Sequence, residues 1–187
     1  MSAVAAPFGL RPVYHPSGSI RPVAVQVASA LATNIFQYSP VQYVAASGTI
    51  ALAAAGARAI GVFMGVEYTP NDGRRRYSNT WPTGQVATQI VAYITRDPYI
   101  TYEIQADGSI AQDDIGECAD WTVNDTTAGN TTTGLSNVAL ATPPAAAIAG
   151  LQILGLMPYV DNDWGDAFTV VEVRIAEHQL LADSTPF

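Results

Sequence analysis

The sequence predicts a mainly β protein, either an antiparallel sandwich or a small barrel, with long loops and an extended N-terminal arm. Short runs of alternating or β-branched residues recur along the chain, and glycine, proline and Asp-Gly turn signals separate them. Helix signals are weak by comparison. Residues 51–58 and 144–149 are rich in alanine, the best helix former, but neither segment has the apolar stripe of a buried helix. We therefore expect at most a turn or two of helix in each.

Alternation and turn signals define the expected strands. In the segment 99–105, Ile100, Tyr102 and Ile104 share one face, as the two-residue period of a strand requires. Residues 72–73 are Asp-Gly, a pair that supplies the positive φ of a tight hairpin. The Thr-rich stretch 122–136 is interpreted as a surface loop. The expected strands are residues 23–27, 59–68, 86–95, 99–105, 151–157 and 168–175.

Residues 1–22 are interpreted as an extended arm, and residues 23–187 as a single β-rich domain. Four prolines interrupt the arm, and proline fixes φ and removes a backbone donor, so a helix is disfavoured there. The arm also carries Phe8, Leu10 and Tyr14. Apolar side chains spaced along an extended segment gain stability only when they lie in a groove, on the same subunit or on a neighbour.

Charge is scarce in this chain. Only 13% of the 187 residues are charged, the net charge is −8, and all eight basic residues are arginine. So low a charge fraction leaves broad uncharged surface, which either consists of Ala, Ser, Thr, Gly and Asn or is covered by another subunit. Arginine suits such an interface, because its guanidinium loses less hydration than an ammonium and forks onto carboxylates.

The one basic cluster is Arg74, Arg75 and Arg76, on the expected hairpin turn. Three arginines in an acidic chain are a weak signal for phosphate binding, because a nucleic-acid binder needs a basic stripe along its surface. A solvated hairpin tip, or a patch that faces an acidic neighbour, explains the cluster better. We therefore expect no nucleic-acid partner.

No residue pattern indicates catalysis. The single cysteine, Cys118, cannot form an internal disulfide. His15 and His178 lie near opposite ends of the chain without a spaced partner for zinc, and no Gly-x-Ser-x-Gly nucleophile elbow occurs. The longest apolar stretch, residues 44–66, contains an arginine and four glycines, so no membrane span is expected. We expect a protein that is not an enzyme, with no catalytic or metal-binding residues and no cofactor.

The acidic segment 161–166 is the sharpest local signal. It resembles a calcium loop, and Glu172 falls at its twelfth position. The match fails at the fifth and sixth positions, Gly165 and Asp166, where such a loop requires a ligand and then a glycine. The alternative is a turn in which Asp and Asn side chains bond their own backbone while Trp164 packs on the sheet. The turn is the interpretation that we adopt.

A resemblance to a known family is carried by short segments in order along the chain: residues 6–13 (Ala-Pro-Phe-Gly-Leu-Arg-Pro-Val), 61–68, 81–84, 97–98, 103–108, 114–116, 132–136 and 161–168. Together these segments resemble small structural proteins from the head modules of tailed bacteriophages, the head decoration (cement) proteins. Such proteins are similar in role to the lambda-type decoration protein. The resemblance implies a protein, commonly trimeric, that binds the outer surface of the capsid and stabilises adjacent major capsid subunits.

The implied partners are the major capsid protein and further copies of this chain in a homotrimer, with no membrane partner. The implied location is the outer surface of the virion, after synthesis in the host cytoplasm. The alternative within this class is another virion subunit, such as a head–tail joining, tail or minor head protein. An alternative from a different class is a calcium- or carbohydrate-binding module that uses residues 161–166 and the tryptophans. The residues expected to contact the capsid or a second subunit are Phe8, Leu10, Arg11, Tyr14, Arg74, Arg75, Arg76, Trp81 and Trp164.

Overall fold

The computed structural model describes residues 2–122, 129–144 and 148–181 of the chain. It confirms the predicted fold class, because the protein is mainly β, with several antiparallel sheets and no closed barrel in the described part. Across the same residues the only helix is one 3-10 turn, η1 (Gln112–Asp114), which no sequence pattern indicated. Residues 51–58 form the end of a strand and a turn instead of a helix. Residues 145–147, in the second alanine-rich segment, and 123–128, in the expected loop, lie outside the described residues.

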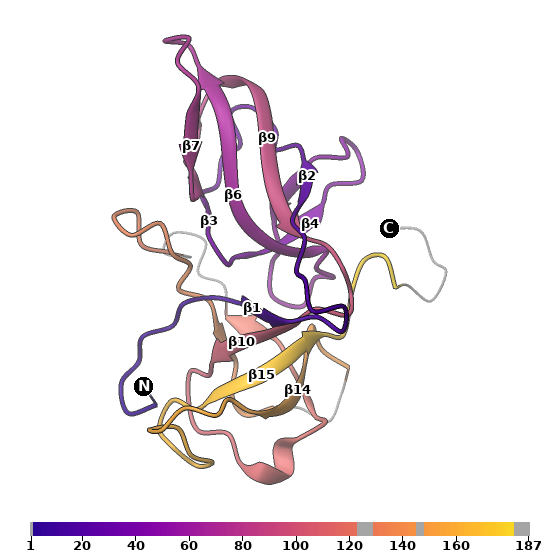
Figure 1. Cartoon of the computed structure of the whole chain (residues 1–187), viewed down its shortest axis with the longest axis vertical. Helices are drawn as coiled ribbons and strands as arrows, with labels where there is room; N and C mark the ends of the chain where they lie inside the picture. Colours follow the sequence, from indigo (N-terminus) through magenta and orange to yellow (C-terminus); the bar gives the residue numbers. More distant parts are fainter. Residues whose placement is uncertain (1, 123–128, 145–147, 182–187) are drawn as a thin grey trace.

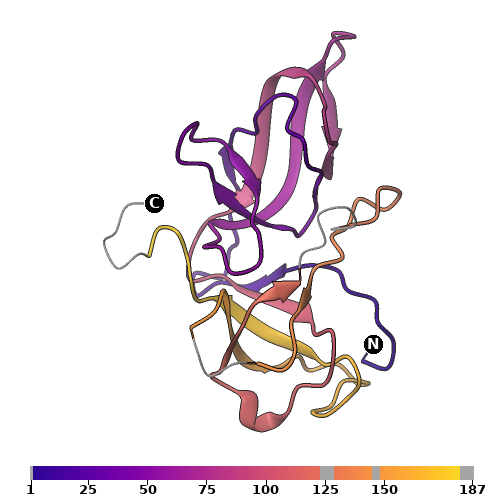
Figure 2. The same ribbon diagram turned by 180° about the vertical axis from the view of Figure 1, so that it is seen from behind.

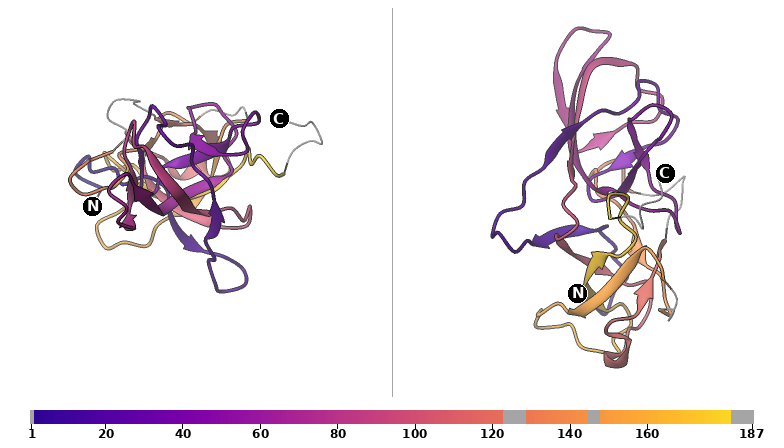
Figure 3. Two further views of the ribbon diagram at one scale, coloured as in Figure 1. Left: turned by 90° about the horizontal axis from the view of Figure 1, so that it is seen from above. Right: turned by 90° about the vertical axis from the view of Figure 1, so that its right-hand side faces the viewer.

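The chain folds into two lobes that follow each other along the long axis of the molecule (Figure 1). The central lobe holds residues 23–95, and the terminal lobe holds residues 2–22 and the described residues of 96–122, 129–144 and 148–181. The view from behind shows the same division, with each main sheet in its own half (Figure 2). A side view shows the chain passing from the terminal to the central lobe through the loop between its first two strands (Figure 3).

The terminal lobe is built on a five-stranded antiparallel sheet in the order β1-β10-β15-β14-β11. Residues from the N-terminal arm form its edge strand, which pairs with β10 of the same chain. A bulge between Ile153 and Gly155 shifts the register of β14 against β15. The strands are β1 (Arg11–Tyr14), β10 (Thr101–Gln105), β15 (Val170–Ile175), β14 (Leu151–Leu156) and β11 (Cys118–Ala119).

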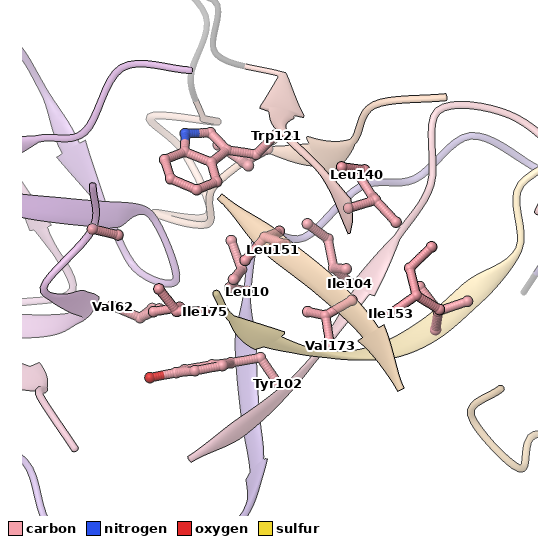
Figure 4. Packing of buried hydrophobic residues seen from close by; sticks show 14 of the residues in the cluster. Leu10, Val62, Tyr102, Ile104, Trp121, Leu140, Leu151, Ile153, Val173 and Ile175 are labelled. Atoms are coloured by element: carbon pink, nitrogen blue, oxygen red, sulfur yellow. The ribbon is translucent and has the colours of Figure 1, made fainter. Parts of the chain in front are cut away.

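One face of this sheet is apolar and packs into the core of the terminal lobe (Figure 4). Tyr102 and Ile104 from β10 lie there beside Val173 from β15 and Ile153 from β14. The alternation predicted for residues 99–105 is therefore confirmed. Burial of each such side chain contributes roughly 1.5–3 kcal/mol, so this face is a major source of stability.

The central lobe is built on a sheet in the order β2-β9-β6-β4-β5, and β7 also pairs with β6. Its core includes Val66 and Tyr68 from β6 and Ala92 and Ile94 from β9. A small ribbon of β3 and β8 lies beside it and contributes Trp81. The strands are β2 (Val23–Val25), β3 (Ile35–Phe36), β4 (Pro40–Tyr43), β5 (Ile50–Leu52), β6 (Gly61–Pro70), β7 (Arg76–Ser78), β8 (Thr80–Trp81) and β9 (Ala87–Thr95).

Polar and apolar contacts join the two lobes. A ribbon of β12 (Trp121–Thr122) and β13 (Ala139–Leu140) places the Trp121 indole in the terminal core. The indole N–H donates to the carbonyl of Ala53, in the central lobe, at 3.3 Å. The backbone N–H of Leu10 likewise donates to the carbonyl of Tyr38 at 2.9 Å. Ala59 and Val62 of the central lobe also pack in the terminal core, so the lobes share part of one core.

Candidate protein-binding surface

The β6–β7 hairpin projects at the top of the central lobe in Figure 1. A group of outward-facing side chains lies on this hairpin and on the neighbouring strand β9. Its position follows from strand alternation, because Val66 and Tyr68 point into the core and the residue between them, Glu67, points outward. Cross-strand pairing sets Tyr77 of β7 directly opposite Glu67. We call this group the hairpin face, and it consists of Met64, Glu67, Arg75, Tyr77 and Tyr93.

The tip of this hairpin is held by Asp72, as the Asp-Gly pattern predicted. One Asp72 carboxylate oxygen accepts the backbone N–H of Arg74 at 3.0 Å, and the other lies 2.5 Å from a guanidinium nitrogen of Arg76. The Arg74 N–H, and then the Arg76 guanidinium, lower the pKa of Asp72. Gly73 has φ of 74°, a conformation that other residues adopt only with strain. Arg76 therefore braces the turn, while the Arg74 side chain has no ion pair within the described part of the chain.

Glu67 organises the middle of the hairpin face. Its carboxylate lies 2.9 Å from a guanidinium nitrogen of Arg75 and accepts the hydroxyl of Tyr93 at 3.0 Å. Hydrogen bonds from Arg75 and then from Tyr93 lower the pKa of Glu67, and the carboxylate in turn raises the pKa of both partners. Near neutral pH the face therefore presents a fixed carboxylate, a fixed cation and a neutral phenol.

A hollow of about 370 Å³ lies beside this network, lined by Met64, Tyr77 and Tyr93 together with the backbone at Gly65. The Tyr77 side chain is 76% exposed at its rim. Tyrosine, methionine and arginine are the residues enriched where proteins bind one another, and tyrosine and arginine dominate the binding energy of such interfaces. The hairpin face therefore has the composition and shape of a protein-binding surface.

The predicted contact residues of the N-terminal arm are divided between internal and exposed positions. Arg11 lies opposite Glu103 in the β1–β10 register, and the two side chains form an ion pair in which the carboxylate is only 1% exposed. Tyr159 donates to the same carboxylate and accepts Nη2 of Arg11 at 3.0 Å. The Phe8 ring centroid lies 5.1 Å from the Arg11 guanidinium carbon. The hydrogen bond to Glu103 raises the pKa of Arg11, and burial opposes this shift. Tyr14 remains exposed at the end of β1.

Two of the predicted contact residues belong to the cores. Leu10 is fully buried in the terminal lobe and Trp81 in the central lobe, where its ring packs edge-on against Tyr68 with centroids 5.2 Å apart. Both were expected to contact a partner, and this expectation is corrected, because neither side chain has exposed surface. An apolar residue in an arm or before a Pro gives the same sequence signal whether it fills a core or an interface.

The acidic segment 161–166 forms the turn that was predicted. The Asn162 amide nitrogen donates to the carbonyls of Met157 and Val170 at 2.9 and 2.8 Å, and its oxygen accepts the Val170 N–H at 2.9 Å. Trp164 is partly buried against the terminal core. Within the described residues no group of three or more His, Cys, Asp or Glu side chains is placed to hold a metal ion. The segment is therefore a structural turn in the connection between β14 and β15.

Ser17, His15 and Asp97 form a chain of polar contacts beside a surface hollow. The Ser17 hydroxyl lies 2.7 Å from Nδ1 of His15, and Nε2 of the ring lies 3.3 Å from the Asp97 carboxylate. These are the groups of a serine-hydrolase triad with the ring nitrogens exchanged, because a triad serine contacts Nε2 and its aspartate contacts Nδ1. Here the Ser17 backbone N–H bonds the same Nδ1 at 3.1 Å, and the next N–H, of Gly18, bonds the His15 carbonyl at 2.8 Å. The Ser17 and Gly18 N–H contacts close a turn. We interpret the His15 ring as the group that holds this turn to Asp97.

The residues of the hairpin face were largely missed from the sequence. Arg75 was predicted as a contact, but Met64, Tyr77 and Tyr93 were not. A signal for Tyr77 was present, because a hairpin with its turn centred on Asp72 pairs residue 67 with residue 77 and puts both on one face. No comparable signal identified Tyr93, whose position depends on the bulge at Phe63–Gly65 between β6 and β9.

Comparisons with known proteins identify no relative of this chain. No family model, curated protein or solved structure matches the chain. No helix in the described residues is both long enough and apolar enough to span a bilayer.

Proposed function

We propose that this chain is a capsid decoration protein, which binds the outer surface of a tailed-phage head and stabilises adjacent major capsid subunits. The observation that carries the proposal is the hairpin face, where tyrosine and methionine line a hollow and an arginine is held beside it by Glu67. The resemblance of ordered segments to decoration proteins supports the same conclusion. Its partners are then the major capsid protein and further copies of the chain in a homotrimer.

The proposal describes binding and no chemistry. In this account the chain is not an enzyme, takes no cofactor, and contacts neither nucleic acid nor membrane. The arginine cluster supports this view, because Arg75 and Arg76 already pair with Glu67 and Asp72 and are not arranged as a basic stripe. The protein is made in the host cytoplasm and is located on the outside of the virion.

Repeated contacts would supply the affinity of such a protein. A trimer seated on three neighbouring capsid subunits uses three copies of the hairpin face at once, and linked sites raise the overall affinity without any new type of contact. Each single contact can then remain small, consistent with a face built from five side chains. A scaffold of buried sheets keeps these side chains in place, because the strands that carry them also carry the central core.

Replacing Tyr77 with alanine is expected to weaken binding to capsid shells about 30-fold, because an exposed tyrosine at the rim of a binding hollow is a typical interface hot spot. The melting temperature should stay close to that of the wild type, since the side chain contributes little to the core. Sedimentation of labelled protein with shells measures the binding. Tyr99→Ala is the matched control, since it removes an exposed tyrosine of the terminal lobe. Equal binding by Tyr77→Ala and wild type would exclude the hairpin face as the capsid contact.

A further inference from the structure

The two histidines of the chain both contact one of the segments that join the lobes. Residues 96–100, called here the connector, lead from β9 in the central lobe to β10 in the terminal lobe. Nε2 of His15 lies 3.3 Å from the Asp97 carboxylate, and Nε2 of His178 lies 3.1 Å from the carbonyl of Arg96. Two residues from opposite ends of the chain thus bond neighbouring residues of one connector.

His178 is held in one neutral tautomer. The side chain is buried, with 2% exposed, and its Nε2 must donate, because the Arg96 carbonyl can only accept. Its Nδ1 must then be unprotonated, and it accepts the backbone N–H of Leu180 at 3.1 Å. A protonated ring would carry a hydrogen on Nδ1 that faces the Leu180 N–H. Protonation therefore breaks this contact and places a charge in a buried site.

The residues around His178 hold the lobes together. We call residues 177–181 the clasp. Its backbone exchanges two hydrogen bonds with Ala59 of the central lobe, from the Ala59 N–H to Glu177 at 3.2 Å and from the Gln179 N–H to Ala59 at 2.9 Å. The Gln179 amide adds two contacts to the backbone of Tyr43, at 2.7 and 3.3 Å. The clasp thus belongs to the terminal lobe by sequence and bonds the central lobe directly.

The charged groups around the ring do not cancel the effect of its burial. Burial lowers the pKa of His178, although the backbone carbonyls of Arg96 and Ile60 and then the Asp97 carboxylate act in the opposite direction. The Arg96 guanidinium adds to the lowering. Arg58 and Glu177 line the hollow beside the ring with opposite charges. Asp97 is in addition shared with His15. The neutral ring is therefore the form that the folded chain favours.

We propose that the clasp is a pH-responsive link, in which protonation of His178 breaks the turn between His178 and Leu180 and with it the bonds of residues 177–181 to Ala59, so that the lobes move relative to each other in acid. This inference is independent of the proposed function. Because the folded chain holds the ring less basic than the unfolded chain does, the unfolded state binds more protons in the window below about 6.5, the ordinary histidine pKa. The stability that the clasp contributes is complete above that pH and is lost as the pH falls below it.

NMR titration of the full chain from pH 8 to 5 tests this proposal. We expect the His178 ring to titrate below 6.5, and the amide resonances of Leu180 and Ala59 to shift with the same midpoint. In His15→Gln, which keeps the clasp, both amides should respond as in the wild type. In His178→Gln the pH response of these amides should disappear, and the melting temperature should fall less between pH 7.5 and 5 than it does in the wild type.

Two results of these experiments would overturn the proposal. If His178 titrates while the Ala59 amide does not move, the clasp does not respond to the charge and the proposal is wrong. An equal fall in melting temperature for wild type and His178→Gln would overturn it as well. Should the variant fail to fold, the wild-type titration still decides, because it follows the ring and the Ala59 amide in the same sample.

Discussion

Replacing Gly61 with alanine is expected to prevent stable folding of the central lobe. A β-carbon added there would lie 1.6 Å from the carbonyl oxygen of Thr95, and the backbone has φ of 150°, which L side chains rarely adopt. The obstacle is the backbone of β9, paired with β6, so no side-chain rotation relieves it. We expect a loss of about 3 kcal/mol or more in the free energy of unfolding, measured by chemical denaturation.

Gly155→Ala is the matched control for this change. Gly155 also lies in a strand beside a bulge, but a β-carbon added there meets no atom within 4 Å. Its free energy of unfolding should stay within about 0.5 kcal/mol of the wild type. Wild-type stability of Gly61→Ala would show that β6 and β9 do not approach each other as described.

Arg11→Ala has the second large expected effect. It leaves the Glu103 carboxylate, which is buried, without its cation, and uncompensated buried charge is strongly destabilising. Because the Arg11 side chain is itself 40% exposed, the effect belongs at the low end of the range for buried pairs. We expect a loss of about 2–3 kcal/mol in the free energy of unfolding.

Two controls isolate this ion pair. The double variant Arg11→Met with Glu103→Gln removes both charges and keeps similar volumes, so it should recover more than half of the lost stability. Tyr14→Ala changes an exposed residue at the other end of β1 and should stay close to the wild type. If Arg11→Ala unfolds at the wild-type denaturant concentration, the N-terminal segment does not depend on its own sheet and is available to a neighbouring subunit.

The local elements were predictable because they depend on neighbouring residues. Alternation along 99–105 and 168–175 identified two paired strands of the terminal sheet, and Asp-Gly identified the hairpin tip at residues 72–73. The turn at 161–166 was predicted for a similar reason, since short polar side chains bond backbone groups only a few residues away.

The long-range pairings were not predictable from local patterns. Nothing near Arg11 indicates that its partner is Glu103, because apolar and proline residues in an arm fit a neighbouring subunit as well as the chain's own sheet. The division into two lobes was missed for the same reason, since each main sheet joins strands that are distant in sequence. The contact made by His178 with the connector likewise depends on tertiary packing alone.

The residues of the hairpin face were difficult to predict for the same reason, because strand pairing brings them together. The sequence identified Arg75 because it lies in a charged cluster. Such a cluster occurs on any exposed turn, so it does not distinguish a binding surface from a solvated one. The companion residues Tyr77 and Tyr93 come together only through the registers of β7 and β9 against β6. Trp81 is a single tryptophan in its segment, and such a residue indicates burial as much as binding.

Binding of the purified chain to expanded phage heads that lack it tests the central proposal most directly. Cryo-electron microscopy of saturated heads gives the position and number of bound copies in one measurement. The proposal predicts density in groups of three on the outer surface, at a copy number comparable to that of the major capsid protein. Density confined to a single vertex would indicate a head–tail joining subunit instead, and heads without bound protein would contradict the decoration role altogether.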